Sequence, residues 1–386
     1  MKLTCLLCGD EIVKENNSSE HIIPNAIGGR KTVKGFICKK CNNFYGNKWD
    51  ADLCRQFDFF CVQLQLKRQR GNHPGMLVST IDGENLIIRH DGSFVKDKPV
   101  FKEQVGDGNV KFHIEARNET EIRKILKGVC RKYPQLDYEN LLSHKQHSTV
   151  PLDSIVNVNV NFGGENFDRS MVKTALAFAF ECGVKLKRSL ISCRYLIEDI
   201  PVRSAPYHFF YSRDLLSNRD RNRIFHCLAI DGDPDRKTLI AYVEYFSFLR
   251  YIVLLDNDYS GEKVKNQYAI DPRTGEELSV DVLIDLSDEE LKKVIDEGAG
   301  YEGFLSEFEH VLSLVIADNH RRGENQAIVD AFDYAKRKLH IKDGDSITKE
   351  AWPDFLKHLS FYLANYICAQ YKMQRQLNEL KINKTE

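Results

Sequence analysis

Residues 38–42 read CKKCN, and residues 5–8 read CLLC. Each cysteine pair has two intervening residues, a spacing at which a tight turn can aim both sulfurs at one metal ion. Four thiolates complete the tetrahedral coordination of Zn²⁺, so the predicted ion is structural and its binding contributes to folding. A thioredoxin-like redox pair is the alternative, but no βαβ pattern surrounds either cysteine pair. We therefore expect one zinc ion on Cys5, Cys8, Cys38 and Cys41.

The spacer between the two cysteine pairs has 29 residues and contains SSEHIIPNAIGGRK. It is longer than the roughly 15 to 20 residues of a plain zinc ribbon. Zinc binding would bring Glu20 and His21 of this spacer close to Asn42, which follows the last cysteine. A carboxylate and an amide oxygen suit Mg²⁺, and an imidazole suits the removal of a proton from water near neutral pH. Taken alone, the Glu-His pair would fit an exposed polar turn better than a catalytic site.

Together these motifs resemble the HNH endonucleases of the four-cysteine, ββα-metal type. The resemblance covers about the first 55 residues. It rests on Cys5-x-x-Cys8, Glu20-His21-Ile22-Ile23-Pro24, Gly28-Gly29, Cys38-x-x-Cys41-Asn42, Gly46 and Trp49-Asp50-Ala51-Asp52-Leu53.

The resemblance implies a role for each motif residue. His21 matches the general base, and Glu20 and Asn42 match the two protein ligands of a catalytic Mg²⁺ or Mn²⁺ ion. The four cysteines match the structural zinc site. In the implied reaction, His21 deprotonates a water that attacks a phosphodiester, while the ion stabilises the charge on the phosphate and the leaving oxygen.

Two departures from the family pattern concern the support of these groups. The stretch RKTVKGFI before Cys38 contains no Asn, whereas many HNH motifs have one there that helps to orient the histidine. Glu20 replaces the commoner Asp. Adjacent residues on a regular strand face opposite sides, so base and ion can meet at one phosphate only if the strand bends near Glu20 and His21. Pro24 is consistent with such a bend.

Basic residues are concentrated near these motifs. Residues 1–70 contain 12 Lys and Arg against 7 Asp and Glu, whereas the whole chain has a formal charge of −1. A local basic face beside a candidate site suits a polyanion such as DNA, and a solvated surface is the alternative. The candidate nucleic-acid-binding residues are Arg30, Lys31, Lys34, Lys39, Lys40 and Lys48.

The composition is that of a globular protein, with 42% hydrophobic and 29% charged residues in 386. We find no apolar run long enough to span a membrane and no signal peptide. Eleven cysteines, most of them single in apolar surroundings, argue against a disulfide framework. We therefore expect a cytoplasmic protein.

The expected fold class is α+β, with an N-terminal zinc-stabilised ββα-metal module followed by a mixed antiparallel-sheet and helical accessory region. Apolar periodicity predicts a helix from Asn42 to about Arg70. Three Asp-Gly turns within residues 76–116 predict a small antiparallel sheet, and a helix should follow at about 119–131.

Further along the chain, alternating Val and Asn predict a strand over 153–162, and an apolar run predicts a helix from Asp168 to Gly183. Two or three strands should lie within 224–255, and helices should predominate after about Ser287. The expected division is into residues 1–70, a small α+β segment at 71–150, an α+β domain at 151–286 and a mostly helical region at 287–386.

Two function classes remain open from the sequence. The first is a DNA endonuclease whose accessory region controls the target, homo-oligomerisation or activation by a ligand, by analogy in a restriction or phage-defence setting. The second is a non-catalytic zinc ribbon that binds nucleic acid or protein. His144 and His147 could bind a metal but fit a solvated loop better, and DGDPD at 231–235 lacks the Glu of a calcium loop.

Overall fold

The computed structural model describes residues 2–69, 71, 73–106, 109–146, 152, 154–198, 206–297 and 301–382. The chain packs into two compact units, and each unit is assembled from separate stretches of sequence. Residues 1–73 and 160–319 form the first unit, and residues 74–159 and 320–386 form the second. These units describe which residues pack together and do not show which segments fold independently. The division into four consecutive segments therefore stays a prediction.

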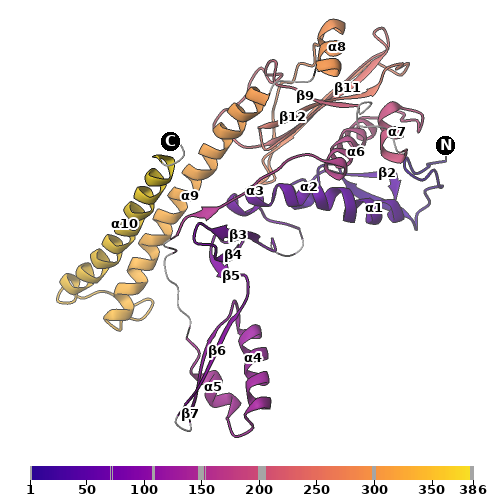
Figure 1. Cartoon of the computed structure of the whole chain (residues 1–386). Helices are drawn as coiled ribbons and strands as arrows, with labels where there is room; N and C mark the ends of the chain where they lie inside the picture. The colour runs from indigo at the N-terminus through magenta and orange to yellow at the C-terminus, as the bar shows by residue number, and fades with distance from the viewer. Residues whose placement is uncertain are drawn as a thin grey trace. The chain divides into compact units, whose positions relative to one another are not determined.

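The first unit begins with a β-hairpin followed by helix, which is the predicted ββα order (Figure 1). Strands β1 (Asn17–His21) and β2 (Thr32–Cys38) are antiparallel, and a short helical turn, η1 (Asn25–Ile27), lies between them. We call residues 2–69 the N-terminal module.

Two glycines allow the β1–β2 loop to fold tightly. Gly28 has a φ of +102°, and a Cβ added there would lie 2.5 Å from Pro272. A Cβ on Gly29 would lie 1.9 Å from the backbone oxygen of Ile23. No side chain fits at either position, so the Gly28-Gly29 pair is required by packing.

The helix predicted from Asn42 to Arg70 is interrupted. The chain forms α1 (Lys39–Tyr45), a wider turn η2 (Gly46–Asp50), α2 (Ala51–Gln56) and α3 (Asp58–Gln63). Between α2 and α3, the Phe57 ring packs against the rings of Phe162 and Phe246 from distant parts of the chain. This tertiary contact, which periodicity does not encode, accompanies the break.

A six-stranded antiparallel sheet and two helices complete most of the first unit. The helices are α6 (Glu165–Glu181) and α7 (Ile191–Ile197). The strand order is β14-β13-β10-β11-β12-β9. The strands are β9 (Tyr207–Phe209), β10 (His226–Asp233), β11 (Thr238–Tyr245), β12 (Leu249–Asp256), β13 (Val264–Ile270) and β14 (Glu277–Leu278).

Both faces of this sheet are buried, by different partners. Alternate residues such as Leu228, Val243 and Tyr251 share one apolar core with α6, α7 and the N-terminal module. The residues between them, such as Ile240 and Ile252, pack in a second core with residues of α8 (Asp288–Glu297). The N-terminal module therefore has no separate core, because its apolar side chains are continuous with those of α6 and the sheet.

Helix α9 (Tyr301–Lys338) contributes its residues up to Asn319 to the first unit and the remainder to the second. The second unit contains two small antiparallel sheets. One has the order β5-β4-β3-β8 and the other pairs β6 with β7. The strands are β3 (Met76–Thr80), β4 (Asn85–Ile88), β5 (Phe94–Lys96), β6 (Val100–Gly106), β7 (Asn109–Glu115) and β8 (Val156–Asn157).

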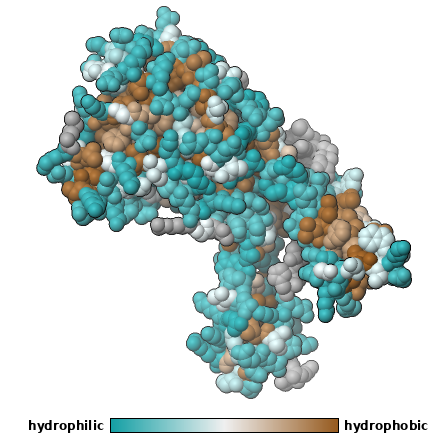
Figure 2. All heavy atoms as spheres, turned by 180° about the vertical axis from the view of Figure 1, so that it is seen from behind, coloured by the Kyte–Doolittle hydropathy of each residue, from teal (hydrophilic) through white to brown (hydrophobic). Residues whose placement is uncertain are grey.

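The helices of the second unit are α4 (Glu119–Lys132), α5 (Tyr138–Ser143), the second part of α9 and α10 (Trp352–Ile382). Hydrophobic side chains are visible at the molecular surface among hydrophilic ones (Figure 2), and on α9 and α10 they include Phe332, Trp352 and Phe361. None of the helices, over the residues described, combines the length and apolar character of a membrane span.

Most of the predicted elements are present, and the α+β class is confirmed. The strand predicted over 153–162 is shorter than expected, because among the described residues of this range only Val156–Asn157 pair within a sheet. The helix predicted from Asp168 begins earlier, at Glu165, and Asp168 is a buried residue inside it that accepts a 2.6 Å hydrogen bond from the Tyr207 hydroxyl. Of the turn residues used in the prediction, Asp107 and Gly108 lie outside the described residues.

Candidate functional site

The four predicted zinc ligands converge at the start of the N-terminal module. The sulfurs of Cys5, Cys8, Cys38 and Cys41 all lie within 4.8 Å of one another. The Cys8 and Cys38 sulfurs are 3.8 Å apart, which is about the edge of a tetrahedron with Zn–S bonds near 2.3 Å. Gly9, with a φ of +82°, closes the first turn, and Cys38 stands directly before α1. The cluster is therefore positioned to bind a metal ion, and its donors fit zinc.

No second group of three or more metal-binding side chains was found among the described residues. The Nδ1 atom of His144 donates a 2.8 Å hydrogen bond to the backbone oxygen of Asn140, as expected for a local loop contact. His147 lies outside the described residues.

Strand pairing separates the two residues of the Glu-His motif. Glu20 pairs with Val33, and His21 pairs with Thr32. Since neighbours along a strand point to opposite faces, the Glu20 side chain lies on the inner face, where it is 4% exposed. His21 ends the strand on the outer face and is half-buried. The register irregularity of this hairpin lies between Asn17 and Ser19, but the strand ends at His21 and the chain bends at Ile22 and Ile23, so the alternation of faces does not continue past the motif.

His21 has a base-like environment. Its Nε2 atom is buried and has no hydrogen-bond partner among the described residues. Burial lowers the pKa of His21 below its ordinary value, a side-chain hydrogen bond with Gln69 opposes this, and the charges of Arg30 and Lys173 reinforce it. The imidazole is therefore held in its neutral form to lower pH than an exposed histidine.

Asn42 lies on α1 and faces the side of the hairpin that carries Glu20. Its amide nitrogen donates a hydrogen bond to the hydroxyl of Ser18, a residue on the same buried face of β1. Its amide oxygen and the Asp50 carboxylate both approach Gly46, at 3.7 and 3.8 Å from the position of an added Cβ. Asn42 and Asp50 therefore present oxygen atoms to the same small region.

A lysine from far along the chain occupies the centre of this region. The Lys173 ammonium on α6 lies 2.5 Å from a Glu20 oxygen and 2.5 Å from an Asp50 oxygen. The Lys173 side chain is 1% exposed. Burial acts to lower the pKa of Lys173, but the carboxylates of Asp50 and Glu20 outweigh it and raise the pKa above its ordinary value. We call Glu20, Asp50 and Lys173 the buried charge cluster.

The sequence motifs in the first 70 residues identify Glu20 as a site residue. They do not identify Asp50 or Lys173 as its partners in this cluster. The sequence does mark Lys173 as unusual, because this charged residue follows Val172 and shortly precedes the apolar run ALAFAF. The helix that contains it is mostly buried. A buried lysine needs an anionic partner, so such a lysine predicts a partner although it does not say which one.

The six candidate DNA-binding residues differ in the exposure and the intramolecular contacts of their side chains. Lys34, Lys39, Lys40 and Lys48 are exposed. Lys34 is cross-strand partner of Ser19, so it lies on the outer face of the hairpin together with His21.

Arg30 and Lys31 have intramolecular contacts. The Arg30 guanidinium donates a 2.9 Å hydrogen bond to the Lys67 backbone oxygen. The Lys31 ammonium lies over the Tyr268 ring, 4.5 Å from its centroid. These two residues thus contribute to packing, whatever else they bind.

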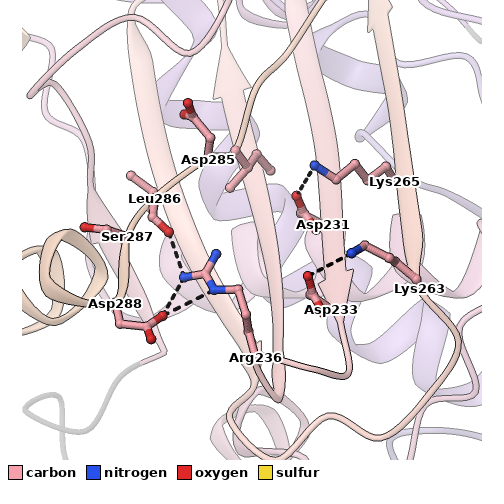
Figure 3. Close-up of a pocket in the computed structure, with 10 residues that line it drawn as sticks. Asp231, Asp233, Arg236, Lys263, Lys265, Asp285, Leu286, Ser287 and Asp288 are labelled. Atoms are coloured by element: carbon pink, nitrogen blue, oxygen red, sulfur yellow. Dashed lines mark hydrogen bonds and ion pairs between the residues drawn. The ribbon is translucent and has the colours of Figure 1, made fainter.

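A cavity lies elsewhere, against the six-stranded sheet (Figure 3). It has a volume of about 480 Å³ and is lined by charged side chains that pair with one another. Lys263 pairs with Asp233, and Lys265 pairs with Asp231. Because these charges are already matched and none of the motif residues lines the cavity, it is not the candidate catalytic site.

No curated protein and no solved structure matches the chain. The family comparison agrees with the arrangement of cysteines, hairpin and helix described above: residues 5–58 of this chain match the HNH endonuclease family.

Proposed function

We propose that the N-terminal module hydrolyses phosphodiester bonds in DNA as a divalent-metal-dependent endonuclease. The observation that carries this proposal is the order and placement of three groups within the stretch that matches the HNH endonuclease family. The cysteine cluster fixes the start of α1, α1 carries Asn42, and β1 carries Glu20 and ends at His21.

In this proposal, His21 is the general base. It takes a proton from the water that attacks phosphorus, and its lowered pKa keeps it neutral and able to accept that proton below pH 7. Its Nε2 atom, which has no hydrogen-bond partner among the residues described, is the proposed accepting atom. The chain lacks the Asn that many HNH motifs have before the second cysteine pair, and the Gln69 side chain, which acts to raise the pKa of His21, is proposed to support the histidine instead.

The proposed ligands of the divalent ion are Glu20 and Asn42. The fit is supported by the donor set, because carboxylate and amide oxygens are ligands that Mg²⁺ and Mn²⁺ prefer. It is also supported by the Lys173 ammonium, a cation that lies against the Glu20 carboxylate. When bound, the ion would neutralise charge on the phosphate and the leaving oxygen. Ser18 orients Asn42 by accepting its amide hydrogen bond.

The proposed DNA-binding surface surrounds the outer face of the hairpin. Lys34 is the basic residue that shares this face with His21. Lys39, Lys40 and Lys48 are exposed on α1 and the turn after it and would contact phosphates further along the backbone.

Residues beyond the module are proposed to control target choice, self-association or activation by a ligand, and a restriction or phage-defence setting is proposed by analogy. A reducing compartment such as the cytoplasm is supported by the eleven cysteines, none of which forms a disulfide.

A plasmid-nicking assay tests the nuclease proposal against a zinc ribbon that only binds. Full-length protein is incubated with supercoiled DNA in Mg²⁺, in Mn²⁺ and without either ion, and zinc content is measured in each sample. Nicking that requires Mg²⁺ or Mn²⁺ while zinc stays bound supports the nuclease. DNA binding without nicking under all three conditions supports the binding module.

A further inference from the structure

We propose that Lys173 is a positioning residue of the nuclease centre, whose ammonium competes with the divalent ion for the carboxylate of Glu20. This inference rests on the proposed function, because it assumes that Glu20 is a ligand of the ion. It adds a residue that lies 115 positions beyond the end of the family match. It also predicts how strongly the centre binds the ion before DNA arrives.

The first support is the position of the ammonium. It contacts Glu20 and Asp50 at 2.5 Å each, and these carboxylates come from different elements, β1 and η2. The Asn42 amide oxygen and the Asp50 carboxylate both lie beside Gly46, 3.7 and 3.8 Å from the position of a Cβ added there. Lys173 therefore lies where oxygen atoms from the hairpin and the helix converge, which is the position that a hard cation would take.

The second support is the charge of the cluster. Two carboxylates and one ammonium leave one negative charge unmatched, in a region where Glu20 and Lys173 are buried and Asp50 is half-buried. A divalent ion near Glu20 would be attracted by that charge but repelled by the ammonium. The ammonium contacts one oxygen of the Glu20 carboxylate. An ion that binds this oxygen has to displace the ammonium, and an ion on the other oxygen is still repelled by it at short range.

The third support is that Lys173 has a second carboxylate partner, Asp50. Asp50 accepts a 2.5 Å hydrogen bond from the Ser170 hydroxyl, and Ser170 and Lys173 are both buried on α6. This contact fixes Asp50 beside the helix. The ammonium can therefore stay paired with Asp50 when Glu20 turns to the ion, and a buried cation is never left without a partner.

The test measures Mn²⁺ binding to full-length protein without DNA, by the electron paramagnetic resonance signal of free Mn²⁺. Lys173→Met removes the competing charge and keeps a long apolar side chain, so Mn²⁺ affinity should rise at least about tenfold. Zinc content and urea unfolding are measured on the same sample. Thr174→Val is the matched control, because it removes a hydrogen bond from the neighbouring buried residue of α6 without changing charge. It should leave Mn²⁺ affinity unchanged.

A double-mutant cycle separates competition from general repulsion. Glu20→Gln should weaken Mn²⁺ binding, and adding Lys173→Met to Glu20→Gln should change the affinity less than about threefold, because the contested carboxylate is gone. Asp50→Asn supplies a variant that retains Lys173. It leaves Glu20 as the lysine's only carboxylate, so Mn²⁺ affinity should fall at least about fivefold.

Unchanged or weaker Mn²⁺ binding by folded Lys173→Met would overturn the inference, and so would an Asp50→Asn variant with the unaltered protein's affinity. If Lys173→Met does not fold, Lys173→Gln, which is also neutral, replaces it in the same measurement with the same expected and contradicting results. The proposed function fails differently. In that case Glu20→Gln would bind Mn²⁺ as the unaltered protein does, whereas weaker binding by Glu20→Gln with no effect of Lys173→Met would keep the metal site and exclude only Lys173.

Discussion

His226 on β10 donates a 2.7 Å hydrogen bond from Nε2 to the backbone oxygen of Ile27 in the β1–β2 loop. Its Nδ1 atom accepts a hydrogen bond from the Phe246 backbone nitrogen, which fixes the neutral tautomer. The sheet therefore holds the loop that follows the Glu-His motif through a fully buried imidazole. A protonated ring could not accept from Phe246.

This contact predicts a dependence of stability on pH. Burial lowers the pKa of His226 to about 4, from an ordinary value of 6.5. Between these values the unfolded chain binds the proton and the folded chain does not. The stabilisation is therefore complete above pH 6.5 and is lost as the pH falls toward 4, by up to about 3 kcal/mol. Urea unfolding at several pH values measures it.

The matched variant for this measurement is His226→Gln, which has no titrating group. Its unfolding free energy should be lower at pH 7 and should vary less between pH 6.5 and 4.5 than that of the unaltered protein. Equal pH dependence of the two proteins would contradict the assigned state of His226.

The cysteine cluster predicts that folding depends on zinc. Cys41→Ser should lose about one equivalent of zinc and destabilise the N-terminal module, because three thiolates and a hydroxyl bind the ion less tightly than four thiolates. Elemental analysis and thermal unfolding measure the two effects. Cys130→Ser is the control, since Cys130 lies on α4 outside the cluster. If the purified protein is well folded but contains no zinc, this result contradicts the structural role assigned to the four cysteines.

The placement of Lys34 predicts a specific effect on DNA binding. Lys34→Ser should weaken binding to duplex DNA and reduce the slope of log affinity against log salt by about 1, as expected for one lost phosphate contact. Lys292→Ser is the control, because Lys292 is exposed on α8, which covers the sheet face away from the N-terminal module. Identical salt slopes for both variants and the unaltered protein would show that Lys34 is only a solvated side chain.

The sequence predicts the features that depend on local spacing. Two residues between cysteines are enough to bring Cys5 near Cys8 and Cys38 near Cys41, and the structure confirms that both pairs meet. The hairpins of β3–β5 follow from Asp-Gly turns, and Gly83 and Gly92 have the positive φ such turns require. In each case, residues close in sequence determine the geometry.

The features that sequence reasoning missed depend on contacts between distant residues. Lys173 and Glu20 are 153 positions apart, and the residues around either one do not indicate that it pairs with the other. The six-stranded sheet likewise contains pairings between strands that are not consecutive in the sequence, β10 with β13 and β9 with β12. The predicted helix from Asn42 to Arg70 fails for the same reason, because the break at Phe57 accompanies ring contacts with residues beyond position 160.

The central claim is that His21 is the base and that Glu20 and Asn42 hold the ion. The most direct measurement is cleavage of a labelled duplex over a Mn²⁺ titration by His21→Ala, Glu20→Gln and Asn42→Ala, with zinc content and DNA affinity measured for each. His21→Ala should cleave roughly 10² to 10⁴ times more slowly at every Mn²⁺ concentration, because added ion does not replace a base. The other two variants should need more Mn²⁺ and recover part of their activity at high concentration. Undiminished cleavage by His21→Ala, or its rescue by Mn²⁺ while Glu20→Gln shows none, would contradict the account.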